Sequence, residues 1–386
     1  MVDLIGFGIV VPVLPFLVKE QGASATQLGL IAMGYAAAQF VCAPLWGRLS
    51  DRIGRRQVLL FTIAGTAVSL AALGFATTVP WILATRVAAG AFAANLGVAS
   101  AYIADATDES ERTRWMGLLG ASFGVGFVLG PVIGSLLGPI SYALPMFVAA
   151  GLAAANWVQA LVWLREPPAH AAAEQEDPTG VRPAGARRFA MLRDPRVRRL
   201  CAANLVFTLA VTQLETVFQY FMNDRFGWGV RDVGFLLVAM AVLMGAVQGG
   251  AMRSLSARFP ERTLVAGGSA LLALAFFVLP ELPTVVWLSA GLAAAAVGRG
   301  VAQPALMSLA SLAAPAGGRG AVMGSFQSAA SLARVIGPLA AGVLYDRAIA
   351  APFLLAGALL LGLVWLGRRL PERVAPPEPV GEPRLA

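Results

Sequence analysis

The sequence predicts an all-α membrane protein with twelve transmembrane helices in two six-helix halves. Three observations support this prediction. The 386-residue chain is 58% hydrophobic and only 13% charged, with a mean hydropathy of +0.73, whereas an average soluble domain is roughly 45–50% apolar. Apolar runs long enough to cross a bilayer, which takes roughly 20 residues, recur along the chain. Motifs of the first six runs return in the second six.

The spans follow from apolar runs that end at turn signals. The expected spans of the first half are 1–18, 28–47, 57–76, 81–104, 115–137 and 142–164. Those of the second half are 200–222, 232–252, 263–279, 285–309, 321–344 and 350–366. We therefore divide the chain into an N-terminal half (1–164), a central cytoplasmic loop (165–199), a C-terminal half (200–366) and a disordered cytoplasmic tail (367–386), because the loop and tail are too rich in Pro and charge to bury a core.

Loop charges set the expected topology, because Lys and Arg accumulate in cytoplasmic loops. Apart from three arginines inside spans, only Lys19, Arg225, Arg231 and Arg347 lie on the side opposite to the chain ends. Both termini are therefore expected in the cytoplasm. No signal peptide is evident, and since the first apolar run begins at Met1, we expect a short first helix or further residues upstream.

Several other classes of protein are disfavoured. The net charge of +8 does not indicate a nucleic-acid partner, because the basic residues separate apolar runs instead of forming a basic stripe. Cys42 and Cys201 lie in apolar runs, so no disulfide framework or metal site is expected. The chain has no phosphate-binding G-x-x-x-x-G-K-[ST] motif, which excludes ATP-driven transport by this chain. An enzyme or a non-transporting sensor is disfavoured too, because the sole histidine, His170, has no partner cluster.

The two halves repeat one another. Leu49–Arg56 aligns with Leu255–Arg262 at an offset of 206 residues, and Met116-Gly117 aligns with Met323-Gly324 at an offset of 207. Parallel repeats of this kind predict a pseudo-twofold axis along the membrane normal and a solute site between the halves. The architecture therefore indicates alternating access.

The loop after the second span carries the most specific motif. Residues 47–56 read G-R-L-S-D-R-I-G-R-R. A small Gly47 allows close helix approach, Gly54 permits a tight turn, and Asp51 can pair with a cation or cap a helix. The string resembles the signature of the major facilitator superfamily, and the resemblance covers essentially the whole chain. It implies a conformational latch formed by Gly47, Asp51, Arg52, Gly54, Arg55, Arg56 and Asp105; the second copy is degenerate because Ala257 replaces the aspartate.

Span five contains small residues at four-residue spacing, Gly126, Gly130 and Gly134, with Pro131. They form a groove for a partner helix, and the proline kinks the span. Generic packing explains many such strings, but the full G-x-x-x-G-P-x-x-G string resembles the antiporter motif of drug/proton exporters. Residues 3–15, 120–124 and 224–228 are similar to tetracycline exporters. The resemblance implies a bacterial inner-membrane exporter of that branch, but not tetracycline as substrate, since spans three and nine lack its aspartates.

Ionisable groups inside a bilayer cost about 2.5 to 3.5 kcal/mol on insertion scales and so indicate function. Glu215 in span seven and Asp3 in span one are candidates for proton coupling, although Glu215 can also form a structural ion pair and Asp3 can be solvated. Arg86 in span four matches an arginine that the family links to proton transfer. It can tune an acid, hold an anion or pair structurally.

Polar and aromatic residues in other spans are candidates for the substrate cavity. They are Tyr35, Gln39, Asn95, Phe218, Gln219, Gln248, Arg299, Gln303, Gln327 and Arg334. Asn95 lies nine residues after Arg86 and points to the opposite side of a regular helix, so we do not expect both in one cavity. An apolar, aromatic cavity suits an amphiphile better than a free sugar.

The sequence therefore predicts a secondary active transporter that exports small amphiphilic compounds in exchange for protons. It needs no cofactor beyond the proton gradient, and its partners are a small-molecule substrate, protons and the lipid bilayer. The fold indicates a monomer. An exporter or symporter of an anionic or sugar-like metabolite remains the alternative, favoured if the intramembrane arginines bind an anion.

Overall fold

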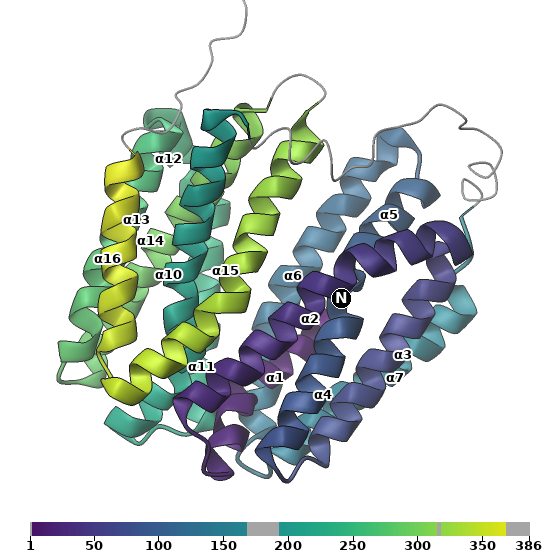
Figure 1. The fold of residues 1–386 in the computed structure, drawn as a ribbon, viewed down its shortest axis with the longest axis horizontal. Helices are drawn as coiled ribbons and strands as arrows, with labels where there is room; N and C mark the ends of the chain where they lie inside the picture. The colour runs from purple at the N-terminus through teal and green to yellow at the C-terminus, as the bar shows by residue number, and fades with distance from the viewer. Residues whose placement is uncertain (1, 168–192, 315–317, 368–386) are drawn as a thin grey trace, which may run out of the picture.

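Every regular element among residues 2–167, 193–314 and 318–367, which the computed structural model describes, is a helix (Figure 1). The first part of the chain forms α1 (Val2–Glu20), α2 (Ala25–Ile53), α3 (Arg55–Gly74), α4 (Val79–Phe92), η1 (Ala93–Asn95), α5 (Leu96–Ala106), α6 (Glu109–Leu137) and α7 (Ala143–Trp163). The second part forms α10 (Pro195–Phe226), α11 (Val230–Ala246), η2 (Val247–Ala251), α12 (Met252–Arg258), α13 (Glu261–Val278), η3 (Leu279–Glu281), α14 (Val285–Leu312), α15 (Arg319–Arg347) and α16 (Ala351–Gly367).

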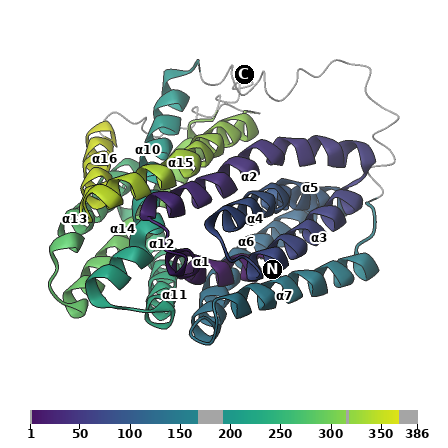
Figure 2. The same cartoon turned by 60° about the horizontal axis from the view of Figure 1, so that its bottom comes forward.

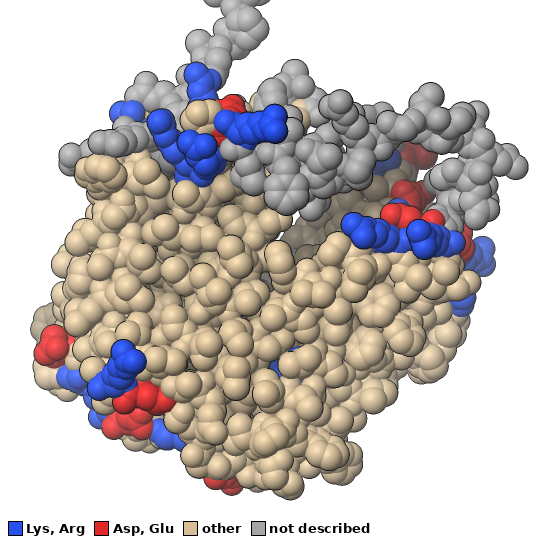
Figure 3. All heavy atoms as spheres, in the orientation of Figure 1, with Lys and Arg blue, Asp and Glu red and all other residues tan. Residues whose placement is uncertain are grey.

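Within those described residues, 11 helices are long and apolar enough to cross a membrane, and the shorter α16 is apolar over its 17 residues. Large apolar side chains are exposed on them, among them Val68 (69%), Trp163 (73%) and Val286 (77%). Charged side chains gather at the two ends of the molecule, with a broad uncharged surface between them (Figure 3). The all-α membrane fold that the sequence predicts is confirmed.

Most helices extend beyond their apolar runs. α2 continues to Ile53, whereas its apolar run ends at residue 47, and α10 begins at Pro195, five residues before the expected span. Polar caps explain such starts: Ser24 accepts from Gln27 N in a capping box, and Asp194 accepts from Arg196 N. The hydropathy of a segment indicates which part of the helix lies in lipid. The capping residues determine where the helix itself begins or ends.

Two spans that the sequence predicts as continuous helices are interrupted. The fourth span changes to a 3₁₀ turn at η1 between α4 and α5, and the eighth widens to a π turn at η2 between α11 and α12. Such turns leave some backbone carbonyl and N–H groups without their α-helical hydrogen bonds, so these groups can bond to other residues. At η1, the Ala93 carbonyl accepts from Gln39 Nε2 of α2 at 3.4 Å.

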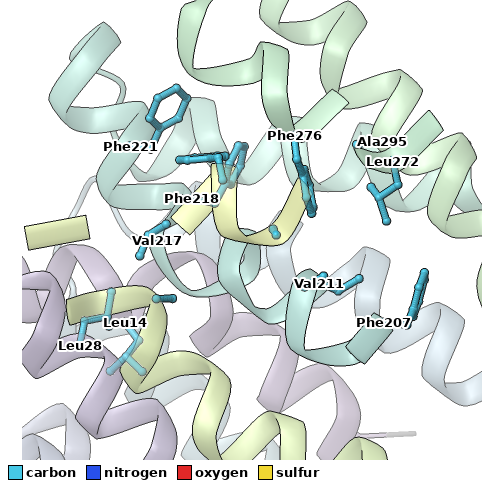
Figure 4. Packing of buried hydrophobic residues seen from close by; sticks show 14 of the residues in the cluster. Leu14, Leu28, Phe207, Val211, Val217, Phe218, Phe221, Leu272, Phe276 and Ala295 are labelled. Carbon is cyan, nitrogen blue, oxygen red and sulfur yellow. The ribbon is translucent and has the colours of Figure 1, made fainter. Parts of the chain in front are cut away.

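The two parts of the chain meet along two related helix pairs, α2 with α15 and α6 with α11 (Figures 1 and 2). Within the first part, α1 packs on α6 and α7, and α2 on α4; within the second, α13 packs on α14 and α16, and α10 on α15. The apolar core continues through α10 and α13, where Phe207, Phe221 and Phe276 are buried (Figure 4).

The molecule has one end at which these parts touch and one at which they separate. At the closed end, where α1 and α10 end, a Cβ at Gly29 would overlap the Pro338 carbonyl and one at Gly138 would meet Val230. Further along the same spans, a Cβ at Gly117 or Gly124 of α6 or at Gly249 of η2 would meet no atom of another helix within 4 Å. At this open end, where α2 ends and α10 begins, Figure 3 shows a hollow between the parts, which we call the cleft.

The expected central loop and tail fall largely on residues outside the described ranges, as does His170.

Candidate functional site

Glu215 of α10 faces Arg299 of α14, and their charged groups form an ion pair at 2.6 Å. Arg299 Nε also lies 3.5 Å from Gln303 Oε1, one helical turn away. The side chains are 48% exposed for Glu215 and 31% for Arg299, so the surrounding helices do not enclose the pair. A carboxylate that is both ion-paired and accessible can give up its contact with the cationic side chain when it takes up a proton.

Asp3, the second acidic candidate, lies on α1 and contacts α7. Its Oδ1 accepts a hydrogen bond from Asn156 Nδ2 at 3.0 Å. No described arginine or lysine forms an ion pair with it. The sequence pointed to Asp3 but not to its amide partner, which lies 153 residues away.

Arg86 lies inside the first part of the molecule, with only 6% of its surface exposed. Its guanidinium carbon is 4.3 Å from the centroid of the Tyr35 ring on α2. The close approach of α4 to α2 depends on Gly90, where a Cβ would overlap the Tyr35 carbonyl. The structure therefore brings together one predicted coupling residue and one predicted cavity residue.

Gln39 and Asn95 both lie near the η1 break but face different partners. Gln39 donates to the freed Ala93 carbonyl, while Asn95 Nδ2 lies 3.4 Å from Thr62 Oγ1 of α3. Arg86 and Asn95 thus face different helices, α2 and α3, in agreement with the expected separation of these two side chains.

The remaining cavity candidates divide by exposure. Gln248, Gln327 and Arg334 are exposed in the described chain. Gln219 is 3% exposed and its Nε2 lies 3.4 Å from the Val11 carbonyl of α1, which links the two parts of the molecule. Phe218, also 3% exposed, packs in the apolar core beside Val217 and so does not line the cleft in this state (Figure 4).

The residues of the expected latch form a cluster at the open end. Arg55 pairs with Asp51 at 2.5 Å and with Asp105 at 3.0 Å, and its Nη1 donates to Ser50. Arg52, by contrast, is exposed and forms no ion pair with the described carboxylates. Arg55 is thus the arginine that joins the two aspartates.

Two glycines of the expected latch, Gly54 and Gly47, differ in backbone conformation and in their neighbours. Gly54 has a φ of 104°, which an L side chain rarely adopts, and it forms the turn between α2 and α3 as expected. A Cβ at Gly47 would have no atom within 4 Å, so the close helix approach expected there is absent from this state of the molecule.

Glu166 is a member of this cluster that sequence reasoning missed. Its two carboxylate oxygens accept from the backbone N–H groups of Arg55 at 2.5 Å and Arg56 at 3.0 Å, at the start of α3. The Arg56 side chain donates in return to the carbonyls of Leu161 and Leu164 at the end of α7. Because Glu166 falls in the expected central loop, the sequence did not indicate this capping role.

The glycines of the span-five motif pack α6 against α1. A Cβ at Gly126 would meet Leu4, one at Gly130 would overlap Gly8, and one at Gly134 would meet the Ile9 carbonyl. The groove that the spacing predicts is therefore occupied by the first helix.

A second charged cluster, at the closed end, was not identified from the sequence. We call it the closed-end network; it comprises Lys19, Tyr220, Asn223, Asp224, Tyr345 and Asp346. Lys19 of α1 forms an ion pair with Asp224 of α10 and donates to Asn223 at 2.6 Å. Tyr345 of α15 donates to Asp224 at 2.8 Å.

The same network also joins α2 to the other part of the chain. The Asp346 carboxylate accepts from the backbone N–H groups of Ala25 at 3.0 Å and Thr26 at 2.9 Å, at the start of α2. Tyr220 donates to the Ala23 carbonyl at 3.1 Å. The sequence contained one signal for this network, namely acids near the ends of spans seven and eleven and the sole lysine at the end of span one. Because the lysine lies more than 200 positions from these acids, no local pattern indicated that they pair.

Among the described residues, no group of three or more His, Cys, Asp or Glu side chains could hold a metal ion.

Comparison with known proteins gives consistent matches over most of the chain. The family model described as Major Facilitator Superfamily matches residues 1–338 and 251–385. The chain is 33% identical over 323 residues to the class D tetracycline resistance protein of Salmonella ordonez, which covers 80% of this chain and 78% of the relative. It is 35% identical over 317 residues to the class C tetracycline resistance protein of Escherichia coli, again with 80% and 78% covered.

A solved structure is similar as well. The crystal structure of the human organic anion transporter MFSD10 (TETRAN) superposes with a TM-score of 0.68 at 27% sequence identity and covers 95% of this chain and 96% of that one.

Proposed function

This chain belongs to the Major Facilitator Superfamily, as one of its drug/proton antiporters, and we propose that it exports small amphiphilic compounds by alternating access. Such transporters are not enzymes and use the proton gradient, with a small molecule and protons as partners. The observation that supports alternating access most directly is the contrast between the closed end and the cleft.

The open end faces the cytoplasm in this proposal. The arginine-rich turn between α2 and α3 and the described start of α10 lie at that end, and positive loops remain cytoplasmic. Both termini are then cytoplasmic, in a bacterial inner membrane, and the state described is inward-facing. Since the cleft lies between two parts of one chain, a monomer suffices for transport.

Proton coupling is assigned to Glu215, with Asp3 as the second acidic group. Protonation of Glu215 from the cleft neutralises the carboxylate and releases Arg299, which changes the contact between α10 and α14. Loss of the proton restores the pair. A proton-dependent change at this contact can then couple proton uptake to the conformational change that antiport requires.

Efflux from cells provides the test. Cells that express the chain are loaded with fluorescent amphiphiles of different charge, including ethidium, and efflux is followed with and without a protonophore. We expect efflux that the protonophore abolishes, and none from cells without the chain. Efflux that continues unchanged after collapse of the proton gradient would contradict proton antiport.

A further inference from the structure

Arg86 is a buried cation without a counter-ion in the described chain. No described carboxylate lies within salt-bridge distance of it, and its Nε is fully buried without a hydrogen-bond partner. An uncompensated charge at membrane depth is strongly unfavourable, so such a group is expected to meet an anion during function.

The other bundle charges do not supply that anion. Glu215 already pairs with Arg299 in the other part of the chain, at 2.6 Å. Asp3 is held by Asn156 between α1 and α7. Arg334, the third arginine inside an expected span, is exposed, and no described carboxylate forms an ion pair with it.

Three aromatic rings from different helices form a row that begins at the guanidinium group. The Tyr35 ring stacks on Arg86, and the Phe7 ring of α1 lies 5.9 Å from the Tyr35 centroid. Phe127 of α6 lies 6.2 Å from Phe7 in an edge-on arrangement and is 46% exposed. Arg86 of α4 thus lies at one end of a row of rings that α2, α1 and α6 contribute in turn.

Hydrogen-bond donors remain free at this surface. The Nη atoms of Arg86 and the hydroxyl of Tyr35 make no hydrogen bond with any described residue, yet none of them is fully enclosed. A guanidinium group beside a phenol offers several donors and no acceptor except the phenolic oxygen, which is the set that a carboxylate prefers.

We propose that Arg86 and the Tyr35 hydroxyl bind the anionic group of the transported compound, and that Phe7 and Phe127 contact its apolar part. The substrate class is therefore an amphiphilic organic anion. This inference rests on the proposed function, because it names the substrate class of the same exporter. It also gives Arg86 a direct role in substrate binding.

Equilibrium binding to the full chain in lipid nanodiscs tests this assignment without a proton gradient. The probes are 2-naphthoate, 2-naphthamide and 2-naphthylmethylammonium, which share one aromatic frame and differ in charge. Empty nanodiscs correct for partition into lipid, and thermal unfolding verifies that each variant is folded.

We expect the wild type to prefer 2-naphthoate, and Arg86→Gln to weaken its binding by about 10-fold or more. Arg86→Lys should retain part of the preference, since it keeps the charge but not the planar donors. Tyr35→Phe, which leaves the arginine in place, should weaken 2-naphthoate binding by about threefold to tenfold. Binding of the amide should stay within about twofold in all variants.

Thr85→Val is the matched control. Thr85 neighbours Arg86 and is also buried, but its hydroxyl bonds the carbonyls of its own helix, at Trp81 and Ile82. It should leave binding of all three probes unchanged.

Two results would overturn the inference: preference of the wild type for the ammonium or the amide, or an equal loss of all three probes in Arg86→Gln. Absence of proton-driven efflux from cells would instead contradict the proposed function alone, because binding to nanodiscs needs no gradient.

Discussion

At the scale of single residues, Glu215 is a partly exposed carboxylate with a cationic partner. Its side chain is about half exposed although α10 is otherwise largely buried, and its charge is balanced by Arg299. Sequence reasoning identified both side chains as functional candidates on separate spans. Only the structure places them against each other.

Glu215→Gln should uncouple transport from protons, because an amide cannot take up or release one at this position. Efflux of the transported fluorescent amphiphile driven by a pH gradient should fall, while downhill exchange of the same compound across proteoliposomes persists. The control is Glu281→Gln, which makes the same change at an exposed residue of η3. Equal dependence on the proton gradient in wild type and Glu215→Gln would exclude a proton role for this carboxylate.

Gly130→Ala should destabilise the protein by about 1–3 kcal/mol, because the added methyl group overlaps the backbone of Gly8 and must separate α6 from α1. Unfolding in detergent measures the effect. Gly124→Ala on the same helix is the matched control, since its Cβ meets no atom within 4 Å and alanine favours a helix. Equal stability of the two variants would show that the close approach at Gly130 is unimportant.

At the scale of helices, the first turn of α3 is connected to three other elements. Arg55 joins α2 and α5 through Asp51 and Asp105, Arg56 reaches the end of α7, and Glu166 caps the new helix. All these contacts lie within the first part of the molecule. In this state, the described part of the cluster connects helices of that half and does not hold the two halves together.

Asp105→Asn should destabilise the protein more than Asp51→Asn does. Asp105 is 29% exposed, and its ion pair joins two helices that are distant in the sequence. Asp51 is 60% exposed, and its partner lies only four positions further along the chain. The expected losses are about 1–2 kcal/mol for Asp105→Asn and about 0.5 kcal/mol or less for Asp51→Asn, because exposed pairs contribute little. Denaturant unfolding and transport rates check both; the reverse order of stability would contradict this view of the cluster.

At the scale of the whole molecule, the closed-end network and the helix crossings hold the two halves together. Lys19 with Asp224, and Asp346 with the start of α2, each connect one half to the other. Alternating access requires these contacts to break when the cleft closes at the other end. In the proposed orientation, the network therefore stabilises the inward-facing state relative to the outward-facing one.

Asp224→Lys should shift the population toward the outward-facing state by roughly fivefold, since partly exposed ion pairs contribute up to about 1 kcal/mol. The measurement is labelling of a cysteine introduced at Gln219 by an impermeant maleimide added outside, after Cys42 and Cys201 are replaced by serine. Labelling should rise in Asp224→Lys. The double variant Lys19→Asp with Asp224→Lys should restore slow labelling because it recreates the pair in reverse. Fast labelling in that double variant as well would contradict an electrostatic role for the pair.

Much of the fold followed from the sequence alone. The spans, the membrane class and the repeat of two halves depend on hydropathy and motif spacing, which are sums and offsets along the chain. The glycine spacing at Gly126, Gly130 and Gly134 likewise predicted a helix groove, because four-residue spacing puts small residues on one side of any helix.

Only the tertiary structure decided which charges meet and which stay alone. Lys19 and Asp224 lie 205 residues apart, and Glu215 pairs across 84 positions, so no local pattern relates them. The interruptions at η1 and η2, the burial of Phe218 and the unpaired Arg86 also depend on neighbours from other helices. Hydrophobic transfer acts on each segment separately, whereas an ion pair or a close packing contact exists only once two distant segments have been brought together.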